Sequence, residues 1–174
     1  ADFKFDHSPT SGQPIDVEHL RALGDRGVSV LMSDSTGAEK EGHSISEKTI
    51  MENLELIFRD SPQMMVCGTF ASLIDRIQQI VILSEKYGRK VIFEGYSMKS
   101  NVEISKELGY LKIQKGTQIT KDQIDNFPRS QITVVATGAQ GESNAALMRI
   151  ANSEHRFVHL QKKDTVIFSS SITS

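Results

Sequence analysis

Five short apolar runs of this sequence each end in small hydroxyl-bearing or glycine residues. The runs lie at 28–32, 65–67, 91–93, 132–136 and 165–168, and the polar residues follow directly at 33–37, 68–72, 94–97, 137–142 and 169–171. Runs of this length and composition are typical of buried strands. Hydroxyl groups and glycine amides can bind an anion, and parallel strands place such residues at one edge of the sheet. The sequence therefore predicts a polar, ligand-binding rim at that edge.

Three groups of this rim have alternative interpretations. The turn at 137–141 could present free amides to an anion, although Glu142 opposes a phosphate there, and we favour a tight strand-to-helix turn. Arg76 lies one turn into a helix, where it could contact phosphate or simply be solvated. Asp34 is the carboxylate inside a hydroxyl cluster at a strand end, or else it caps the following turn.

Other catalytic patterns have little support. No G-x-G-x-x-G follows a strand, no phosphate-binding lysine motif occurs, and no contiguous H-x-H-x-D-H metal motif is present. His155 and His159 have metal-ligand spacing, but we favour ordinary surface or packing histidines because no third ligand lies nearby. Ser72 and Ser97 have no neighbouring histidine and no G-x-S-x-G context, which argues against a serine hydrolase.

Composition is that of an ordinary globular α/β protein. The 174 residues are 38% hydrophobic and 24% charged, with a net charge of −2, so any nucleic-acid contact needs a local patch. The single Cys67 fits a reducing compartment, and no leader or membrane-spanning run is evident. We expect a cytoplasmic protein that does not bind membranes.

Helical patterns separate the strands, which is the layout of parallel βαβ units. Residues 2–6 alternate polar and apolar and are expected to form a half-buried strand. Helices are expected at 15–23, from a capping box at Ser44–Glu47 onward, at about 72–87, up to Leu108, after a capping box at Thr120, and at about 142–152. Both ends of the chain look cut.

The ordered motifs of this chain resemble the ribonuclease J family, which comprises metallo-β-lactamase nucleases with a β-CASP domain. The matching stretches are 2–7 with Pro9, 33–36 with 38–39, 69–72 with 76–79, 95–98 with 101–102, 137–142, 164–166 and 169–170. The resemblance implies a three-layer α/β fold with a mainly parallel, Rossmann-like sheet. It assigns residues 1–40 to the C-terminal part of a metallo-β-lactamase domain and 41–174 to the β-CASP domain.

The resemblance also implies a zinc-dependent hydrolase that cuts RNA exonucleolytically from the 5′ end and endonucleolytically, with two metal ions activating water. Asp2 corresponds to a metal-bridging carboxylate, and Asp34 to an acidic motif that orients a metal-ligand histidine. RNA would pass the strand ends, where the candidate contacts are Ser72, Arg76, Ser97, Thr137, Gly138, Gln140, Gly141 and Ser169.

This chain departs from the family pattern. The histidine cluster before Asp2 and the glycine-histidine stretches after the last serines are missing, Ala1 replaces a usual glycine, and Tyr96 replaces a common arginine. We therefore expect an RNA-clamping fragment that is inactive alone, needs its missing metallo-β-lactamase domain, and belongs to a homo-oligomeric parent. The alternatives are a free-standing module that binds a nucleotide or another small anion after Ala136, and a purely structural or assembly role.

Overall fold

The computed structural model describes residues 3–35, 38–39, 41–138, 141 and 145–169. The chain divides into two compact units, Ala1–Asn53 and Leu54–Ser174, which are described separately below. Asp2, Gln140 and the residues after Ser169 lie outside the described part, so the predictions made for them are not addressed by the structure.

The second unit is built on a four-stranded sheet in which every pairing is parallel. Its strands are β1 (Met65–Gly68), β2 (Lys90–Glu94), β3 (Ile132–Ala136) and β4 (Thr165–Phe168), in the spatial order β2-β3-β1-β4. In register, Glu94 and Gly68 both pair with Ala136, and Gly68 also pairs with Phe168. All four carboxyl ends therefore lie at the same edge of the sheet.

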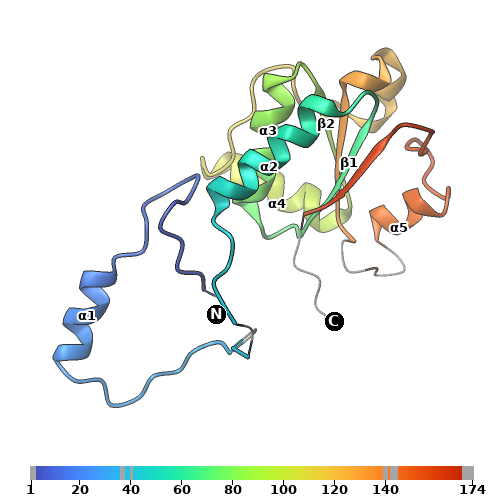
Figure 1. Ribbon diagram of the computed structural model, residues 1–174. Coiled ribbons are helices and arrows are strands. Elements are labelled where there is room, and N and C mark those ends of the chain that lie inside the picture. Colours follow the sequence, from blue (N-terminus) through green and yellow to red (C-terminus); the bar gives the residue numbers. More distant parts are fainter. Residues whose placement is uncertain (1–2, 36–37, 40, 139–140, 142–144, 170–174) are drawn as a thin grey trace. The chain divides into compact units, whose positions relative to one another are not determined.

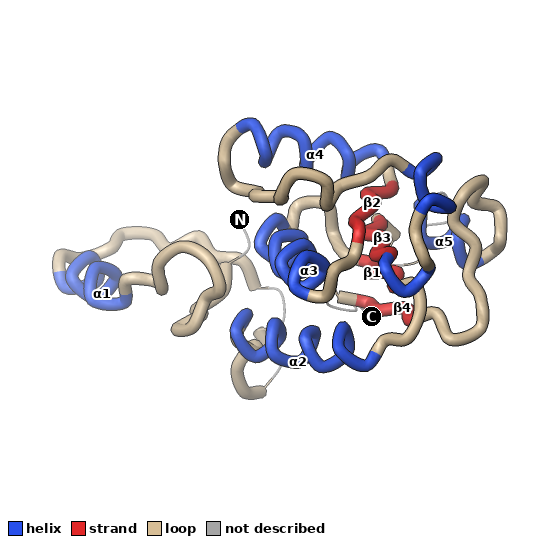
Figure 2. Tube along the Cα trace, turned by 90° about the horizontal axis from the view of Figure 1, so that it is seen from above, coloured by secondary structure: helices blue, strands red, loops and turns tan. Residues whose placement is uncertain are grey.

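Helices cover both faces of this sheet, which gives the three layers expected from the sequence (Figure 1, Figure 2). Helices α3 (Ile74–Lys86) and α4 (Tyr96–Glu107) lie on one face, while α5 (Ala146–Ala151) lies on the other. Two 3-10 helices, η1 (Lys121–Asn126) and η2 (Arg129–Gln131), lead into β3. No helix in the described ranges is long and apolar enough to cross a bilayer.

The core explains why the strands read as continuous apolar runs. Strands buried on both faces need apolar side chains at every position. Val66, Ile92 and Val134 pack in one cluster with Leu147 and Ile150 of α5. Cys67 lies fully buried in β1, and this burial raises the pKa of its thiol to about 12, so it is a packing residue.

The sequence predicts most ends of helices and strands in the second unit close to their positions in the structure. All four strands of this sheet occur where they were predicted, within one residue at each end. The Thr120 capping box is confirmed, with its side chain and that of Gln123 each bonding the other's backbone. Helix α5 begins at Ala146, after the expected start near 142.

The first unit contradicts two predicted strands. The described part of residues 2–6 and all of residues 28–32 form neither strand nor helix, and Met32 is 92% exposed although burial was predicted. Both segments have the side-chain pattern of a strand. A strand, however, also needs a neighbouring strand that pairs with its backbone N–H and C=O groups. Within the described part of this unit no strand is present to pair with either segment.

Helices in the first unit have well-defined amino ends. The Asp16 carboxylate accepts a hydrogen bond from the His19 amide and caps α1 (Val17–Asp25). Helix α2 (Glu47–Asp60) begins three residues after the predicted Ser44 cap, and the Ser46 hydroxyl instead accepts the Thr49 amide.

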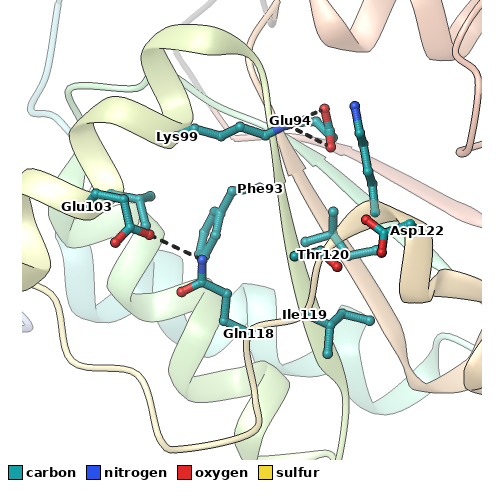
Figure 3. A pocket seen from close by; sticks show the side chains of 11 residues that line it. Phe93, Glu94, Lys99, Glu103, Gln118, Ile119, Thr120 and Asp122 are labelled. Carbon is teal, nitrogen blue, oxygen red and sulfur yellow. Dashed lines mark hydrogen bonds and ion pairs between the residues drawn. The ribbon is translucent and has the colours of Figure 1, made fainter.

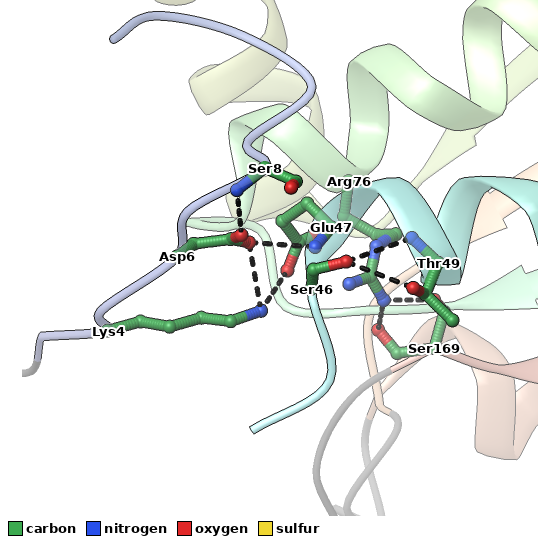
Figure 4. A network of polar contacts seen from close by, with 8 residues as sticks. All are labelled: Lys4, Asp6, Ser8, Ser46, Glu47, Thr49, Arg76 and Ser169. Atoms are coloured by element: carbon green, nitrogen blue, oxygen red, sulfur yellow. Dashed lines mark hydrogen bonds and ion pairs between the residues drawn. The ribbon is translucent and has the colours of Figure 1, made fainter. Parts of the chain in front are cut away.

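The Asp6 carboxylate stabilises the start of α2 by accepting the Glu47 amide at 2.7 Å (Figure 4). It also accepts the Ser8 amide at 2.9 Å. These two backbone hydrogen bonds lower the pKa of Asp6, with the Lys4 ammonium contributing less.

Candidate functional site

The carboxyl edge of the sheet brings together polar residues from four separate strands. The Thr69 amide donates to the Ala136 carbonyl at 3.1 Å, the Thr137 amide to Glu94 at 3.2 Å, and the Ser169 amide to Gly68 at 2.8 Å. Each of these residues directly follows its strand, so the sheet ladder continues one residue into the polar tips. We call Thr69, Gly95, Thr137 and Ser169 the rim.

One loop and the start of a helix extend the rim with exposed serines. Ser72 follows β1, and Ser97 lies in the first turn of α4; both are exposed. The Asn101 side-chain amide of α4 donates to the Ala71 carbonyl at 2.9 Å, which ties α4 to the loop after β1. Ser72, Ser97 and Gly138 therefore lie at the same edge of the sheet, as the sequence pattern predicts.

Gly95 makes the close approach between β2 and β3 possible. Its φ of +110° is a backbone conformation that favours glycine, and a Cβ atom there would lie 2.3 Å from the Thr137 Oγ1 atom. The hydroxyl of Thr137 therefore occupies the space that a side chain at position 95 would need.

The glycine turn after β3 favours the tight-turn interpretation. The Gly141 amide donates to the Gly138 carbonyl at 3.1 Å, so it closes the turn. A Cβ on Gly138 would lie 2.4 Å from Cβ of Ala145, so this glycine allows close packing inside the turn. Helix α5 starts only at Ala146 and has six residues, so its amino end is not where the predicted anion cradle placed it.

Arg76 is buried against the end of β4 (Figure 4). Its Nη1 atom donates to the Ser169 hydroxyl at 2.5 Å and to the Ser169 carbonyl at 3.3 Å. The Thr69 hydroxyl donates to the same carbonyl at 3.1 Å. Two of the sequence candidates, Arg76 and Ser169, are thus in direct contact.

A charged cluster lies beside the rim at the end of β2. Glu94 is 3% exposed, and its carboxylate accepts from the Lys99 ammonium at 3.0 and 3.1 Å. The His155 Nε2 atom lies 3.5 Å from the same carboxylate. Glu94 was not among the residues predicted from the sequence, because a glutamate at the end of a strand is normally solvated and its partners on α4 and in the 153–158 segment are not evident from local pattern.

A cavity of about 320 Å³ opens next to this cluster, between β2, α4 and residues 118–122 (Figure 3). Its polar lining has three carboxylates against two ammonium groups, contributed by Glu94, Glu103, Asp122, Lys99 and Lys121. Because Glu94 is already paired with Lys99, the cavity has no surplus positive charge for phosphate.

We expect His155 to make the fold sensitive to mild acid. Its Nδ1 atom accepts the Val158 amide at 3.0 Å and the Phe157 amide at 3.3 Å, so its proton resides on Nε2. Burial is the main cause of a His155 pKa below 6.5; Arg149 and Lys121 lower it further, and Glu94 partly opposes them. The unfolded chain then binds the proton more readily, and the His155 contribution to stability is lost as pH falls below about 6.5.

This expectation is checked by urea denaturation between pH 7.5 and 5. A His155→Asn variant keeps an acceptor near the Nδ1 position and should lose less stability over this range than the unmodified chain. The matched His159→Asn change, at an exposed histidine, should leave the pH dependence as it was. Equal pH dependence in all three proteins would contradict the assignment.

Metal ligands do not gather in the described part of the chain. Its histidine, cysteine, aspartate and glutamate residues form no group of three or more that could hold a metal ion. His155 faces Glu94 and His159 is exposed, so the pair does not form a metal site. Asp34 is half-buried in the first unit, and the Ser33 hydroxyl donates to its carbonyl at 3.0 Å. The described residues therefore do not fit a complete metal centre.

Comparison with known proteins identifies the family. Residues 62–173 match the family described as "Ribonuclease J, beta-CASP domain". Ribonuclease J 1 of Streptococcus pyogenes serotype M3 is 45% identical over 98% of this chain, Ribonuclease J of Helicobacter pylori 37% over 97%, and Ribonuclease J2 of Bacillus subtilis 32% over 97%. The chain spans only 30%, 24% and 30% of these relatives. It therefore belongs to the ribonuclease J family and contains the β-CASP domain of such a protein.

Proposed function

We propose that this chain is the RNA-clamping part of a metal-dependent ribonuclease that hydrolyses phosphodiester bonds. The observation that carries the proposal is the rim: in a ribonuclease J family chain, hydroxyl-bearing tips of separate strands lie at one sheet edge, joined by inter-strand hydrogen bonds. Ligands of parallel α/β sheets bind outside this edge. The proposed RNA contacts are Ser72, Ser97, Thr137, Gly138, Gln140, Gly141 and Ser169, with Arg76 behind Ser169.

The first unit supports a proposal about the missing part of the protein. Residues 1–40 would complete a metallo-β-lactamase domain supplied by the rest of the parent chain, with Asp2 as a metal ligand and Asp34 orienting a ligand histidine. This role would account for the exposed apolar side chains of the first unit, because the rest of the proposed domain could bury them. These are Phe3, Phe5, Val28, Val30, Leu31 and Met32. The parent would then bind two zinc ions, cut RNA exo- and endonucleolytically, act in the cytoplasm, and assemble as a homo-oligomer.

We expect the 174-residue chain to bind single-stranded RNA without cleaving it. Only Asp2 among its residues is proposed as a metal ligand, so added zinc or manganese should produce no turnover. The measurement combines fluorescence anisotropy with a labelled RNA oligomer and a gel assay of the same RNA with either metal. Robust cleavage by this chain would contradict the proposed division of labour, and absence of RNA binding would contradict the clamp.

The second candidate is a module that binds a nucleotide or small anion at the turn after Ala136. The Gly141 amide would have to turn away from the Gly138 carbonyl, to which it now donates, before it could bind an anion. A thermal-shift comparison of mononucleotides with RNA oligomers distinguishes the two functions. Stabilisation by mononucleotides alone would favour the module over the clamp.

A further inference from the structure

Arg76 and Ser169 form a contact that joins two distant parts of the second unit. Arg76 comes from the first turn of α3, and Ser169 directly follows β4, one of the two edge strands of the sheet. Arg76 is 8% exposed, and its guanidinium donates to both the hydroxyl and the carbonyl of Ser169 (Figure 4). Ser169 is itself 6% exposed and also receives the Thr69 hydroxyl on its carbonyl.

The geometry points to Arg76 as a positioning residue, which holds the end of β4 in place and acts on RNA only through Ser169. We infer that its charge is used inside the protein, on the Ser169 oxygens, rather than on an RNA phosphate. This inference rests on the proposed RNA function, because it assigns how one cation serves that site.

Three features support a positioning role over a phosphate contact. A buried guanidinium that moved out to a phosphate would leave the Ser169 hydroxyl and carbonyl without this donor, at the cost of desolvated polar groups. Hydrogen bonds from a charged donor are stronger than neutral ones, so the contact can fix the direction in which the chain leaves β4. β4 also has only one strand neighbour, β1, so its end depends more on side-chain contacts than the central strands do.

The test compares Arg76→Gln, Arg76→Lys and Ser169→Ala in the full 174-residue chain. Arg59→Gln is the matched control, because it removes the same charge from an exposed site on α2 that pairs with Asp60. RNA affinity is measured for a single-stranded oligomer at a series of KCl concentrations. Hydrogen exchange over residues 165–169 is measured in the absence of RNA.

A positioning role predicts that Arg76→Gln weakens RNA binding by about tenfold at every salt concentration. The slope of log affinity against log salt should stay unchanged, whereas loss of one phosphate contact would reduce it by roughly 0.7. Amide exchange at the end of β4 should accelerate in Arg76→Gln, less in Arg76→Lys, and not in Arg59→Gln. In the Ser169→Ala background, Arg76→Gln should weaken binding by clearly less than tenfold, since the hydroxyl it holds is gone.

A reduced salt slope, or unchanged exchange over residues 165–169, would overturn the positioning role. If the unmodified chain binds no RNA, the clamp function fails and the proposed effect of Arg76 on RNA fails with it. The exchange data then still decide whether Arg76 holds the end of β4, so the two failures are distinguishable.

Discussion

Replacing Gly95 with alanine is expected to lower the free energy of unfolding by about 3 kcal/mol or more. Two costs combine: the backbone at φ +110° and ψ 141° is unfavourable for a residue with a side chain, and the new Cβ would lie 2.3 Å from the Thr137 hydroxyl. Each cost is about 1–3 kcal/mol in other proteins. Chemical denaturation followed by circular dichroism measures the change.

Two controls separate the backbone cost from the steric one. Gly109 has φ +78° and open space around its Cβ position, so Gly109→Ala should cost only about 1 kcal/mol. The Thr137→Ala change removes the clashing hydroxyl. Gly95→Ala should therefore lower the free energy of unfolding by less in the Thr137→Ala background than in the unmodified chain. If the losses in stability caused by Gly95→Ala and Thr137→Ala are simply additive, glycine is not needed at position 95 to make room for the Thr137 hydroxyl.

Replacing Arg89 with methionine is expected to cost about 3–5 kcal/mol of stability, since each buried acceptor left without a donor costs about 1–3 kcal/mol. Arg89 is 4% exposed and immediately precedes β2, at the edge opposite to the rim. Its guanidinium donates to the Ser61, Gln63 and Ile132 carbonyls at 2.8, 2.9 and 3.3 Å. Burial lowers the pKa of Arg89, and its removal leaves three buried or half-buried acceptors without their donor.

The lysine variant and an exposed arginine are the controls for this prediction. Arg89→Lys keeps the charge but lacks the planar guanidinium that donates to several carbonyls. Its stability should therefore lie between that of Arg89→Met and that of the unmodified chain. Arg59→Met, on the α2 surface, should change stability by less than about 0.5 kcal/mol. RNA affinity of folded Arg89→Lys should be unchanged. Weaker RNA binding by folded protein would show that this edge also serves the ligand.

How much of the fold was predictable differs between the two units. In the second unit, the apolar runs at 65–67, 91–93, 132–136 and 165–168 predict all four strands, because both faces of that sheet are covered by helices of the same unit. The run at 28–32 is equally apolar and forms no strand. An apolar run indicates that a segment favours burial, but it does not indicate whether another part of the protein is present to cover it.

The site was predictable in outline but not in its contacts. The recurrence of serine, threonine and glycine after strands was sufficient to place Ser72, Ser97 and Gly138 at one edge. It could not reveal that Arg76 reaches Ser169 or that Glu94 meets His155, since these pairs come from elements distant in sequence. The resemblance to ribonuclease J, confirmed by comparison, supplied the family that local patterns alone left open.

Hydrogen exchange of the chain with and without a saturating single-stranded RNA tests the central claim most directly. The account predicts that RNA slows exchange at residues 69–73, 95–98, 137–138 and 165–169, which adjoin the carboxyl ends of the strands. It also predicts no change around Ser61–Gln63 and Arg129–Gln131, near the opposite edge. Protection confined to that opposite edge would contradict it.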